Sequence, residues 1–372
     1  MARKIFKKTM QILLVILLIT LIGGMLYMRS DRFGINAAGA RLERMQKSPN
    51  YKNGAFDNLE NTPALAEDAS YSKMLRKFFF EKKVRNSPSN PLPVIKTDLK
   101  NLPIDSNLYV WFGHSSYLLQ LDGKKILVDP VLSEYASPVR ISAKAFPMEY
   151  VYQPEDMPEI DILVITHDHW DHLDYNTLKA IQQRVKHIVT GLGVAAHLEK
   201  WGFPTEKITE LYWGEEAYVD GFKFTSATAR HFSGRTFTRN TTLWSSFILH
   251  SITKKIYIGG DSGYGKHFKE IGEQYGPFDY AILENGQYNQ MWKYIHMMPE
   301  EVITAANELK AKYTMPVHSS KFALAMHEWD DSLIRVAKAA EENNYPIVTP
   351  KIGQVVSLDN YVKLPNWWEG ID

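Results

Sequence analysis

A run of residues that can bind metal directly follows an apolar, β-branched segment, and it constrains the fold of this chain more than any other feature. The segment is Ile160–Thr166, and the residues after it are His167, His169, Asp171 and His172. An apolar run of this kind is typical of a strand that is buried on both faces. Open α/β sheets place their sites beyond the carboxyl ends of such strands. The sequence therefore predicts an α/β fold with a site at one edge of a sheet.

Three further residues of the same types occupy the same position after other strand candidates. They are His231 after Phe222–Arg230, Asp261 after Lys255–Gly260, and His318 after Tyr313–Val317. Because a sheet brings the ends of its strands to one rim, we expect all seven residues to meet there. Chance clustering on a solvated loop would explain any single histidine, but it explains the ordered set poorly.

The chemistry of these residues predicts a dinuclear metal site. Histidine and carboxylate are the ligands that zinc prefers. In the extended turn after the strand, His167 and His169 lie on one side, whereas Asp171 and His172 can face a second ion. Two neighbouring ions can generate a hydroxide and stabilise negative charge on oxygen. We expect two Zn²⁺, with iron or manganese as alternatives in such a site.

Several motifs around these residues resemble one known family. The matching stretches are 111–119, 126–131, the 166–172 run, 231–235, 240–247, 259–264, 275–279, 296–301 and 316–325. They resemble the metallo-β-lactamase superfamily, and within it the bacterial proteins similar to N-acylphosphatidylethanolamine-hydrolysing phospholipase D, with UlaG-like lactonases as cousins. The resemblance extends from about Pro91 to Glu328. It implies a four-layer αββα sandwich, which the alternation of strand and helix candidates in both halves also favours.

The resemblance also implies a role for each ligand. One metal would be held by His167, His169 and His231, the other by Asp171, His172 and His318, and Asp261 would bridge the two. A hydroxide between the metals would then attack phosphorus or a carbonyl carbon, so that no side-chain nucleophile is needed.

Three residues near the ligands have two interpretations each. Asp168 would accept a proton or merely orient water, and His296 would line the substrate side or belong to a helix cap. Asp129 would steady the ligand loop, as in the family, or be an ordinary turn aspartate. His114 is a further candidate for the substrate side. His187, His197, His250, His267 and His327 have no partner that the sequence identifies.

Two segments depart from the phospholipase pattern. His318-Ser319-Ser320 stands where that branch has His-Trp-Gly, and Glu284-Asn-Gly-Gln-Tyr288 stands where it has Pro-Ile-Gly-Ala-Tyr. Because both segments flank the predicted metal site, the substrate can differ even where the metal chemistry is the same.

The amino terminus predicts a membrane anchor. Residues 9–28 carry no charge, and about 20 residues at roughly 1.5 Å each match a hydrocarbon core of roughly 30 Å. The preceding Arg3, Lys4, Lys7 and Lys8 place the amino terminus in the cytoplasm and the body outside, although Arg29, Arg32 and Arg41 oppose this orientation. The alternative is a cleaved signal peptide, but the nearest suitable site, Ala38-Gly39-Ala40, lies well beyond the apolar run.

We expect three parts: an anchor over residues 1–28, a lead-in over 29–105 and the hydrolase domain over 106–372. Within the lead-in, Tyr71–Arg85 is basic and aromatic. It would rest on anionic lipid, or form a helix whose phenylalanines cover the core. Helices are predicted over residues 176–185, 194–201, 267–275, 299–309 and 332–343, and strands over 108–112, 117–121, 125–128, 160–166, 187–190, 222–227, 243–250, 255–258 and 280–283.

Composition excludes some functions. The chain has no cysteine, so it contains no disulfide, thiolate ligand or cysteine nucleophile. The net charge of +1 argues neither for nor against a nucleic-acid partner, but the body has no basic tract of the kind that follows phosphates, so we expect none. We therefore expect a membrane-anchored phosphodiesterase that acts on a lipid or small-molecule phosphodiester. A lactonase or other acyl hydrolase is the alternative, and the complete ligand set argues against a degenerate binding protein. The sequence carries no signal for the oligomeric state.

Overall fold

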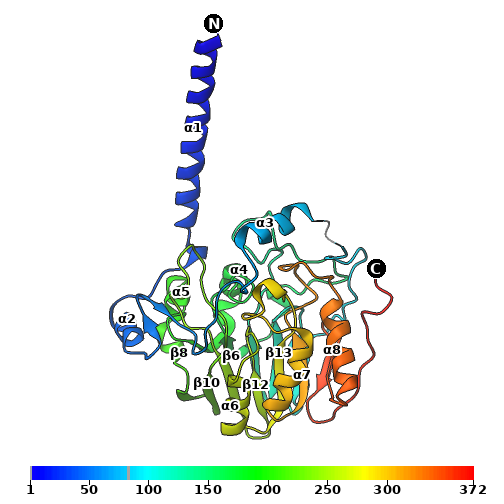
Figure 1. The fold of residues 1–372 in the computed structure, drawn as a ribbon. Helices are drawn as coiled ribbons and strands as arrows, with labels where there is room; N and C mark the ends of the chain where they lie inside the picture. The colour runs from blue at the N-terminus through cyan, green and yellow to red at the C-terminus, as the bar shows by residue number, and fades with distance from the viewer. Residues whose placement is uncertain (1, 82–83) are drawn as a thin grey trace.

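Two β-sheets lie face to face in the computed structural model, which describes residues 2–81 and 84–372 (Figure 1). One sheet has seven strands in the order β15 (Val355–Ser357), β3 (Leu108–Trp111), β4 (Tyr117–Leu121), β5 (Lys124–Val128), β6 (Ile160–Ile165), β7 (Val185–Gly191) and β8 (Ile208–Leu211). The other has six in the order β14 (Ala311–Val317), β13 (Phe278–Glu284), β12 (Lys255–Ile258), β11 (Ser246–His250), β10 (Phe222–Ala227) and β9 (Glu216–Val219).

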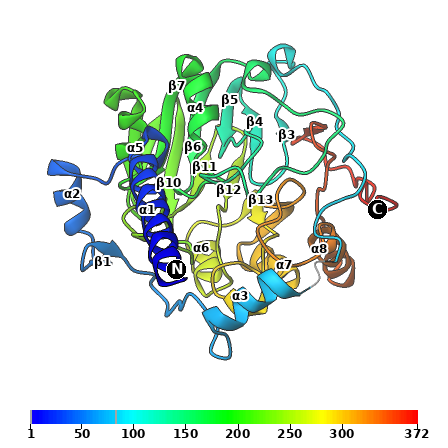
Figure 2. The ribbon, with the colours of Figure 1, turned by 90° about the horizontal axis from the view of Figure 1, so that it is seen from above.

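Helices cover the outer face of each sheet (Figure 2). The first sheet packs against α4 (Tyr175–Ile181) and α5 (Ala195–Lys200), and the second against α6 (His267–Gln274), α7 (Pro299–Glu308) and α8 (Asp331–Glu342). A third apolar layer lies between the sheets. The predicted four-layer αββα sandwich is therefore confirmed.

The alternation of side chains along a strand explains the layers. In β6, Ile162 and Val164 face the other sheet, whereas Leu163 and Ile165 face the helices. In consequence the strand is apolar from Ile162 to Ile165, as strands buried on both faces are, and its one charged residue, Asp161, is paired with Lys186 near the start of the strand. β5, β6 and β7 are parallel, and so are β12, β13 and β14. The residues that follow their carboxyl ends therefore meet at one end of the sandwich.

Some element boundaries differ from those predicted. The helix expected over residues 176–185 ends at Ile181 and continues as a short 3₁₀ turn, because Val185 pairs with Ile160 and opens β7. Strands β8, β9 and β15 were not predicted. They lie at or next to sheet edges, where half-exposed positions weaken the apolar pattern.

The amino-terminal helix α1 (Ala2–Met28) projects from the body with its apolar side chains exposed (Figure 1). Of the residues that the structure describes, it forms the one helix that is long and apolar enough to cross a membrane, judged by length and composition. It is a candidate for a membrane span or a signal sequence.

The lead-in wraps around the body as α2 (Gly39–Gln46), β1 (Tyr51–Lys52), β2 (Ala55–Phe56) and α3 (Tyr71–Phe80). The lead-in also contains short 3₁₀ helices at Asp31–Phe33 and Leu99–Asn101, and the body contains others at Pro154–Asp156, Thr205–Lys207 and Gln290–Trp292. Arg41 in α2 binds Glu199 and Glu210, each at 2.6 Å. These ion pairs attach α2 to the side of the body that carries α5 and β8.

Helix α3 leaves Phe78 and Phe80 exposed. Phe78 is 42% exposed and Phe80 is 84% exposed, and Leu75 is 49% exposed. The helix of the second alternative is present over Tyr71–Phe80, but Phe78 and Phe80 do not cover the core as that alternative expected. Lys82 and Lys83, which belong to the predicted segment, lie outside the described residues.

Candidate metal centre

The seven predicted ligands come together at the carboxyl ends of the strands. His167, His169, His231 and Asp261 form one group, and Asp171, His172 and His318 form a second together with His114. In each group, one potential ligand atom of every residue lies within 4.8 Å of the others. β6, β10, β12 and β14 supply the strand ends. β12 and β14 are joined through the parallel strand β13, and β10 runs in the same direction as β12 because both are antiparallel to β11.

Asp261 lies between the two groups. Its Oδ2 atom is 3.8 Å from His167 Nε2 and 3.6 Å from His231 Nε2. Its Oδ1 atom is 3.2 Å from His172 Nε2 and 3.2 Å from His318 Nδ1. One carboxylate therefore presents one oxygen to each group, which is the geometry that a bridging ligand requires.

Hydrogen bonds from outside the cluster orient the imidazoles. Asp129 accepts a 2.8 Å hydrogen bond from His172 Nδ1, and His231 Nδ1 donates to the carbonyl of Ile295 at 2.8 Å. Asp129 also accepts the Thr166 N–H at 2.9 Å and the Thr166 hydroxyl at 2.6 Å. With Nδ1 used in this way, Nε2 of each ring has its lone pair directed inward. Asp129 thus holds the ligand turn and is not merely a turn residue.

The charges in the cluster favour a cation. Burial raises the pKa of Asp261, but the charges of His172 and His318 outweigh burial and hold that pKa well below its usual value. Burial lowers the pKa of His172, but Asp261 and Asp171 outweigh it and raise the pKa well above its usual value. In addition, His172 Nε2, His318 Nε2 and Asp261 Oδ1 are buried without a hydrogen-bond partner. Divalent metal ions fit this donor set, because they would satisfy both the orphaned atoms and the negative charge.

The sequence suggested a place on the substrate side for His114, whereas the structure places it within the second group of potential ligands. Its Nε2 atom is 2.8 Å from Asp171 Oδ2, and its ring lies 4.1 Å from that of His318 between centroids. Its backbone is also tied to the last ligand loop, because its N–H donates to the carbonyl of Ser319 at 2.7 Å. His114 therefore belongs to the second group or holds Asp171 in place. The signal was present, since His114 closely follows β3 as the other ligands follow their strands.

Asp168 faces away from the ligand atoms. One of its oxygens lies 3.2 Å from His197 Nε2, and the other accepts the N–H of Gly234 at 2.6 Å. Burial raises the pKa of Asp168, but the hydrogen bond to His197 and the neighbouring positive charges together outweigh burial and lower the pKa to about 2. His197, for which the sequence identified no partner, is thus the partner of Asp168. Because both oxygens are occupied, the geometry favours a role in positioning the ligand turn.

His296 lies at the edge of the cluster, in a third group with Asp261 and His318. It precedes the cap residue of α7 by two positions, so it does not cap the helix. Its Nδ1 atom is 3.6 Å from the buried Glu284 carboxylate. Burial raises the pKa of Glu284 to about 7. Burial lowers the pKa of His296, but Glu284, Asp261 and Asp171 together outweigh burial and raise that pKa above its usual value. The departure at Glu284 therefore places a buried carboxyl group next to His296 at the edge of the cluster, with no hydrogen bond between the two.

The lead-in also contributes to the site. Asn58 donates to the carbonyl of His231 at 2.7 Å and accepts the N–H of the same residue at 3.1 Å. This pair of bonds fixes the backbone of one ligand from a segment 173 residues away in the chain. The sequence did not identify Asn58, because the contact is formed only by the fold.

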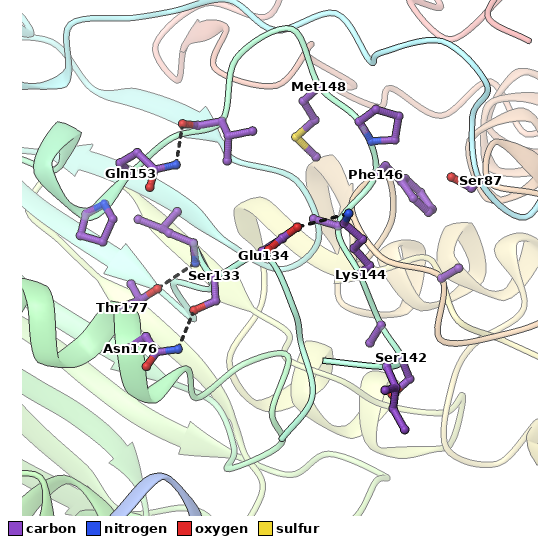
Figure 3. A pocket seen from close by; sticks show the side chains of 18 residues that line it. Ser87, Ser133, Glu134, Ser142, Lys144, Phe146, Met148, Gln153, Asn176 and Thr177 are labelled. Carbon is purple, nitrogen blue, oxygen red and sulfur yellow. Dashed lines mark hydrogen bonds and ion pairs between the residues drawn. The ribbon is translucent and has the colours of Figure 1, made fainter. Parts of the chain in front are cut away.

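A pocket of about 430 Å³ opens on the cluster. It is lined by His169 and Asp171, by the apolar Met28, Trp170, Phe232, Phe237 and Leu324, and by Arg235 and Arg239, among others. A larger cavity of about 960 Å³ lies across the loop that follows β5 (Figure 3). Ser133 and Asn176, which are hydrogen-bonded to each other, and Glu134 and Lys144, which form an ion pair, line that cavity. None of the candidate ligands lines it, so the smaller pocket is the entrance to the cluster.

Known proteins resemble this chain in sequence and fold. Residues 124–319 match the model of a beta-lactamase superfamily domain. An uncharacterized protein of Mycobacterium bovis is 38% identical over 343 residues, which cover 90% of this chain and 91% of that protein. The N-acyl-phosphatidylethanolamine-hydrolyzing phospholipase D 1 of Caenorhabditis elegans is 30% identical over 298 residues, which cover 74% of this chain and 82% of that enzyme. The solved structure of Igni18, a metallo hydrolase of Ignicoccus hospitalis, matches in fold with a TM-score of 0.52 at 21% identity, covering 68% of this chain and 97% of that one.

Proposed function

The chain belongs to the metallo-β-lactamase superfamily of metal-dependent hydrolases, and from this premise we propose that it is a membrane-anchored dinuclear phosphodiesterase that acts on phospholipid-like substrates. The observation that carries the proposal of two metals is the position of Asp261. Its two oxygens face two different groups of buried imidazoles. A site for a single ion would not use both sides of one carboxylate in this way.

We assign the ligands as follows: His167, His169 and His231 hold one ion, Asp171, His172 and His318 hold the other, and Asp261 serves both. Two divalent ions bound there would activate water and stabilise negative charge on a phosphoryl or carbonyl oxygen. His114 orients the Asp171 carboxylate through its Nε2 atom. Asp129 keeps the proton of His172 on Nδ1, and the Ile295 carbonyl does the same for His231.

The pocket supports a substrate with an apolar part and a phosphate. Aromatic side chains lie beside the candidate ligands, and the exposed Arg239 supplies positive charge. Arginine pairs well with phosphate oxygens, and apolar walls bind acyl chains. The similarity to a phospholipase D that hydrolyses N-acyl-phosphatidylethanolamine agrees with this substrate class.

His296 and Glu284 can move a proton at the edge of the site. The pair is buried, and the pKa of Glu284 near 7 suits proton transfer at neutral pH. We place His296 on the substrate side, where it would donate a proton to the leaving oxygen. Asp168 acts through His197 and the Gly234 backbone, so we assign it to positioning.

A lactonase or other acyl hydrolase is the second candidate. The observation that favours it is the replacement of segments next to the ligands by Glu284 and Ser319, both of which are buried. A carboxyl group that is partly protonated near neutral pH could protonate an alkoxide leaving group in either reaction.

The two candidates are separated by activity assays on metal-analysed, full-length protein. We expect about two transition-metal ions per chain and faster hydrolysis of phosphodiesters than of lactones or β-lactams. A long acyl chain should raise kcat/KM, because it adds apolar contact in the transition state as well as in binding. Turnover of short lactones about a hundred-fold better than of any phosphodiester would overturn the phosphodiesterase assignment.

A further inference from the structure

Helix α1 is attached to the rim of the pocket without a flexible linker. The hydroxyl of Tyr27, in its last turn, donates to the carbonyl of Pro138. The next turn of chain also packs on the body: the carbonyl of Arg32 accepts a 2.9 Å hydrogen bond from Arg235, and Phe33 packs edge-on against Trp170 at 5.1 Å between ring centroids. The direction of α1 therefore sets the orientation of the pocket.

The end of the apolar helix is itself part of the pocket. Met28, the last residue of α1, lines the same pocket as His169 and Asp171. The uncharged stretch of α1 ends at this residue, and about 20 helical residues span roughly 30 Å of hydrocarbon. If α1 crosses a bilayer, the pocket mouth lies at the level where hydrocarbon meets headgroups.

Exposed apolar side chains lie at this mouth and on the loop that continues from it. Phe237 in the pocket rim is 91% exposed. Ile141, three residues after the rim residue Pro138, is 90% exposed and lines the larger cavity. Arg239 is exposed and lies 4.9 Å from the ring of Phe232. Apolar side chains that water surrounds, accompanied by cations, are typical of surfaces that enter the headgroup region of an anionic membrane.

Helix α3 lies on the same side of the body as α1 (Figures 1 and 2). It exposes Leu75 and Phe80 and carries Lys73, Arg76 and Lys77 with no acidic residue inside the helix. A helix with an exposed apolar part and a basic part binds in the plane of an anionic leaflet.

We infer that Phe237, Ile141 and α3 form a membrane-contact surface, through which the pocket takes its substrate directly from the leaflet that surrounds the end of α1. This inference rests on the proposed function for the nature of the substrate, but the contact surface itself does not depend on hydrolysis. The occupant of the surface is an anionic phospholipid leaflet, because the exposed side chains are apolar and basic.

The absence of cysteine allows a direct test by single labels. Phe237→Cys and Leu75→Cys, each carrying an environment-sensitive fluorophore, are compared with Ile252→Cys in full-length protein in nanodiscs of phosphatidylcholine and phosphatidylglycerol. Ile252 is a matched control, because it is 87% exposed and precedes β12, at the opposite end of that strand from Asp261. All three variants share the same anchor, so anchoring alone does not distinguish them.

We expect the labels at positions 237 and 75 to shift to shorter emission wavelengths and to be quenched by aqueous iodide at least about threefold less than the label at 252. Equal quenching at 237 and 252 would overturn the contact surface. Shielding at 237 with full exposure at 75 would remove α3 from it.

A second measurement separates uptake from function. The protein in one nanodisc should hydrolyse lipid in its own disc and leave lipid in separate discs largely intact. Equal rates on both would overturn direct uptake from the leaflet, whereas no hydrolysis of phosphodiester lipid in either would overturn the proposed function and leave the label result standing.

Discussion

Replacing Asp129 with Asn tests whether the hydrogen bonds behind the ligands set the metal affinity. The carboxylate accepts three bonds: its Oδ1 takes the Thr166 N–H, and its Oδ2 takes the Thr166 hydroxyl and His172 Nδ1. An amide offers one oxygen and one NH₂ group. Whichever way the amide turns, its NH₂ group faces at least one donor, so rotation cannot restore the native bonds.

The expected loss follows from the bond to His172. Hydrogen bonds to charged groups contribute about 1.5–3 kcal/mol, and residues that orient metal ligands typically change affinity by about 10- to 100-fold. These two figures agree, because a tenfold change corresponds to about 1.4 kcal/mol. We expect Asp129→Asn to weaken the ion held by His172 by about 10- to 100-fold and the other ion by less.

Calorimetric titration of metal-free protein with Zn²⁺ measures both affinities. Asp122→Asn is the matched control. Like Asp129, Asp122 has a positive φ and accepts backbone N–H and threonine hydroxyl bonds, but it follows β4 instead of β5. Because β4 and β5 are antiparallel, Asp122 lies at the end of the sheet away from the ligands. Native affinity for both ions in Asp129→Asn, or an equal loss in Asp122→Asn, would refute the reasoning.

Three other predictions test the site, its surroundings and the anchor. Asp261→Ala should lose both ions together and abolish turnover, as measured by elemental analysis and assay, and one full-strength ion with near-normal turnover would contradict the bridging role. Burial lowers the pKa of Lys321 from 10.5 to about 8, so the unfolded chain binds the proton more tightly. The free energy of unfolding of metal-free protein should therefore rise between pH 8 and 10.5, and urea unfolding of Lys321→Met should lack this rise. Protease added to intact cells or protoplasts should digest residues 50–372 and leave a short membrane-held fragment, whereas full protection would place the body in the cytoplasm.

The parts of the site that the sequence could predict are those encoded locally. The run after β6 combines a strand and its ligands within 13 residues, 160–172, and each later ligand also follows its own strand. The parallel order of the strands then brings these ends together. No knowledge of the tertiary structure was needed beyond the rule that sites form at the carboxyl ends of strands.

The parts that it could not predict depend on contacts between distant segments. Asn58 meets His231 across 173 residues, and Asp168 meets His197 across 29. A polar residue in a loop has no local pattern that reveals such a partner. For a related reason, β9 escaped prediction: it is an edge strand whose residues Glu216 and Tyr218 are exposed, so its apolar alternation is incomplete.

The arginine behind the ligand turn connects these distant parts. Arg235 is buried, and burial lowers its pKa to about 10. It donates to the carbonyls of Asp168 and Leu173 at 2.9 and 2.7 Å, so it holds the ligand turn at both ends. Its guanidinium also lies 3.9 Å from the centre of the Trp170 ring, which packs on Phe33 just beyond α1.

The contacts of Arg32 and Phe33 predict where the chain can be shortened to remove α1 without weakening metal binding. A chain shortened to begin at Arg29 keeps the Arg32 carbonyl, which accepts from Arg235, and keeps Phe33. A chain that begins after Phe33 loses the Arg32 contact to Arg235 and the Phe33 contact to Trp170, although no metal ligand is removed. Because Arg235 would then be buried with an unsatisfied N–H, we expect the shorter chain to bind metal more weakly in the same calorimetric titration, and the longer one to match the full-length protein. Equal affinities in the two truncations would show that the ligand turn holds its shape without the residues that follow α1.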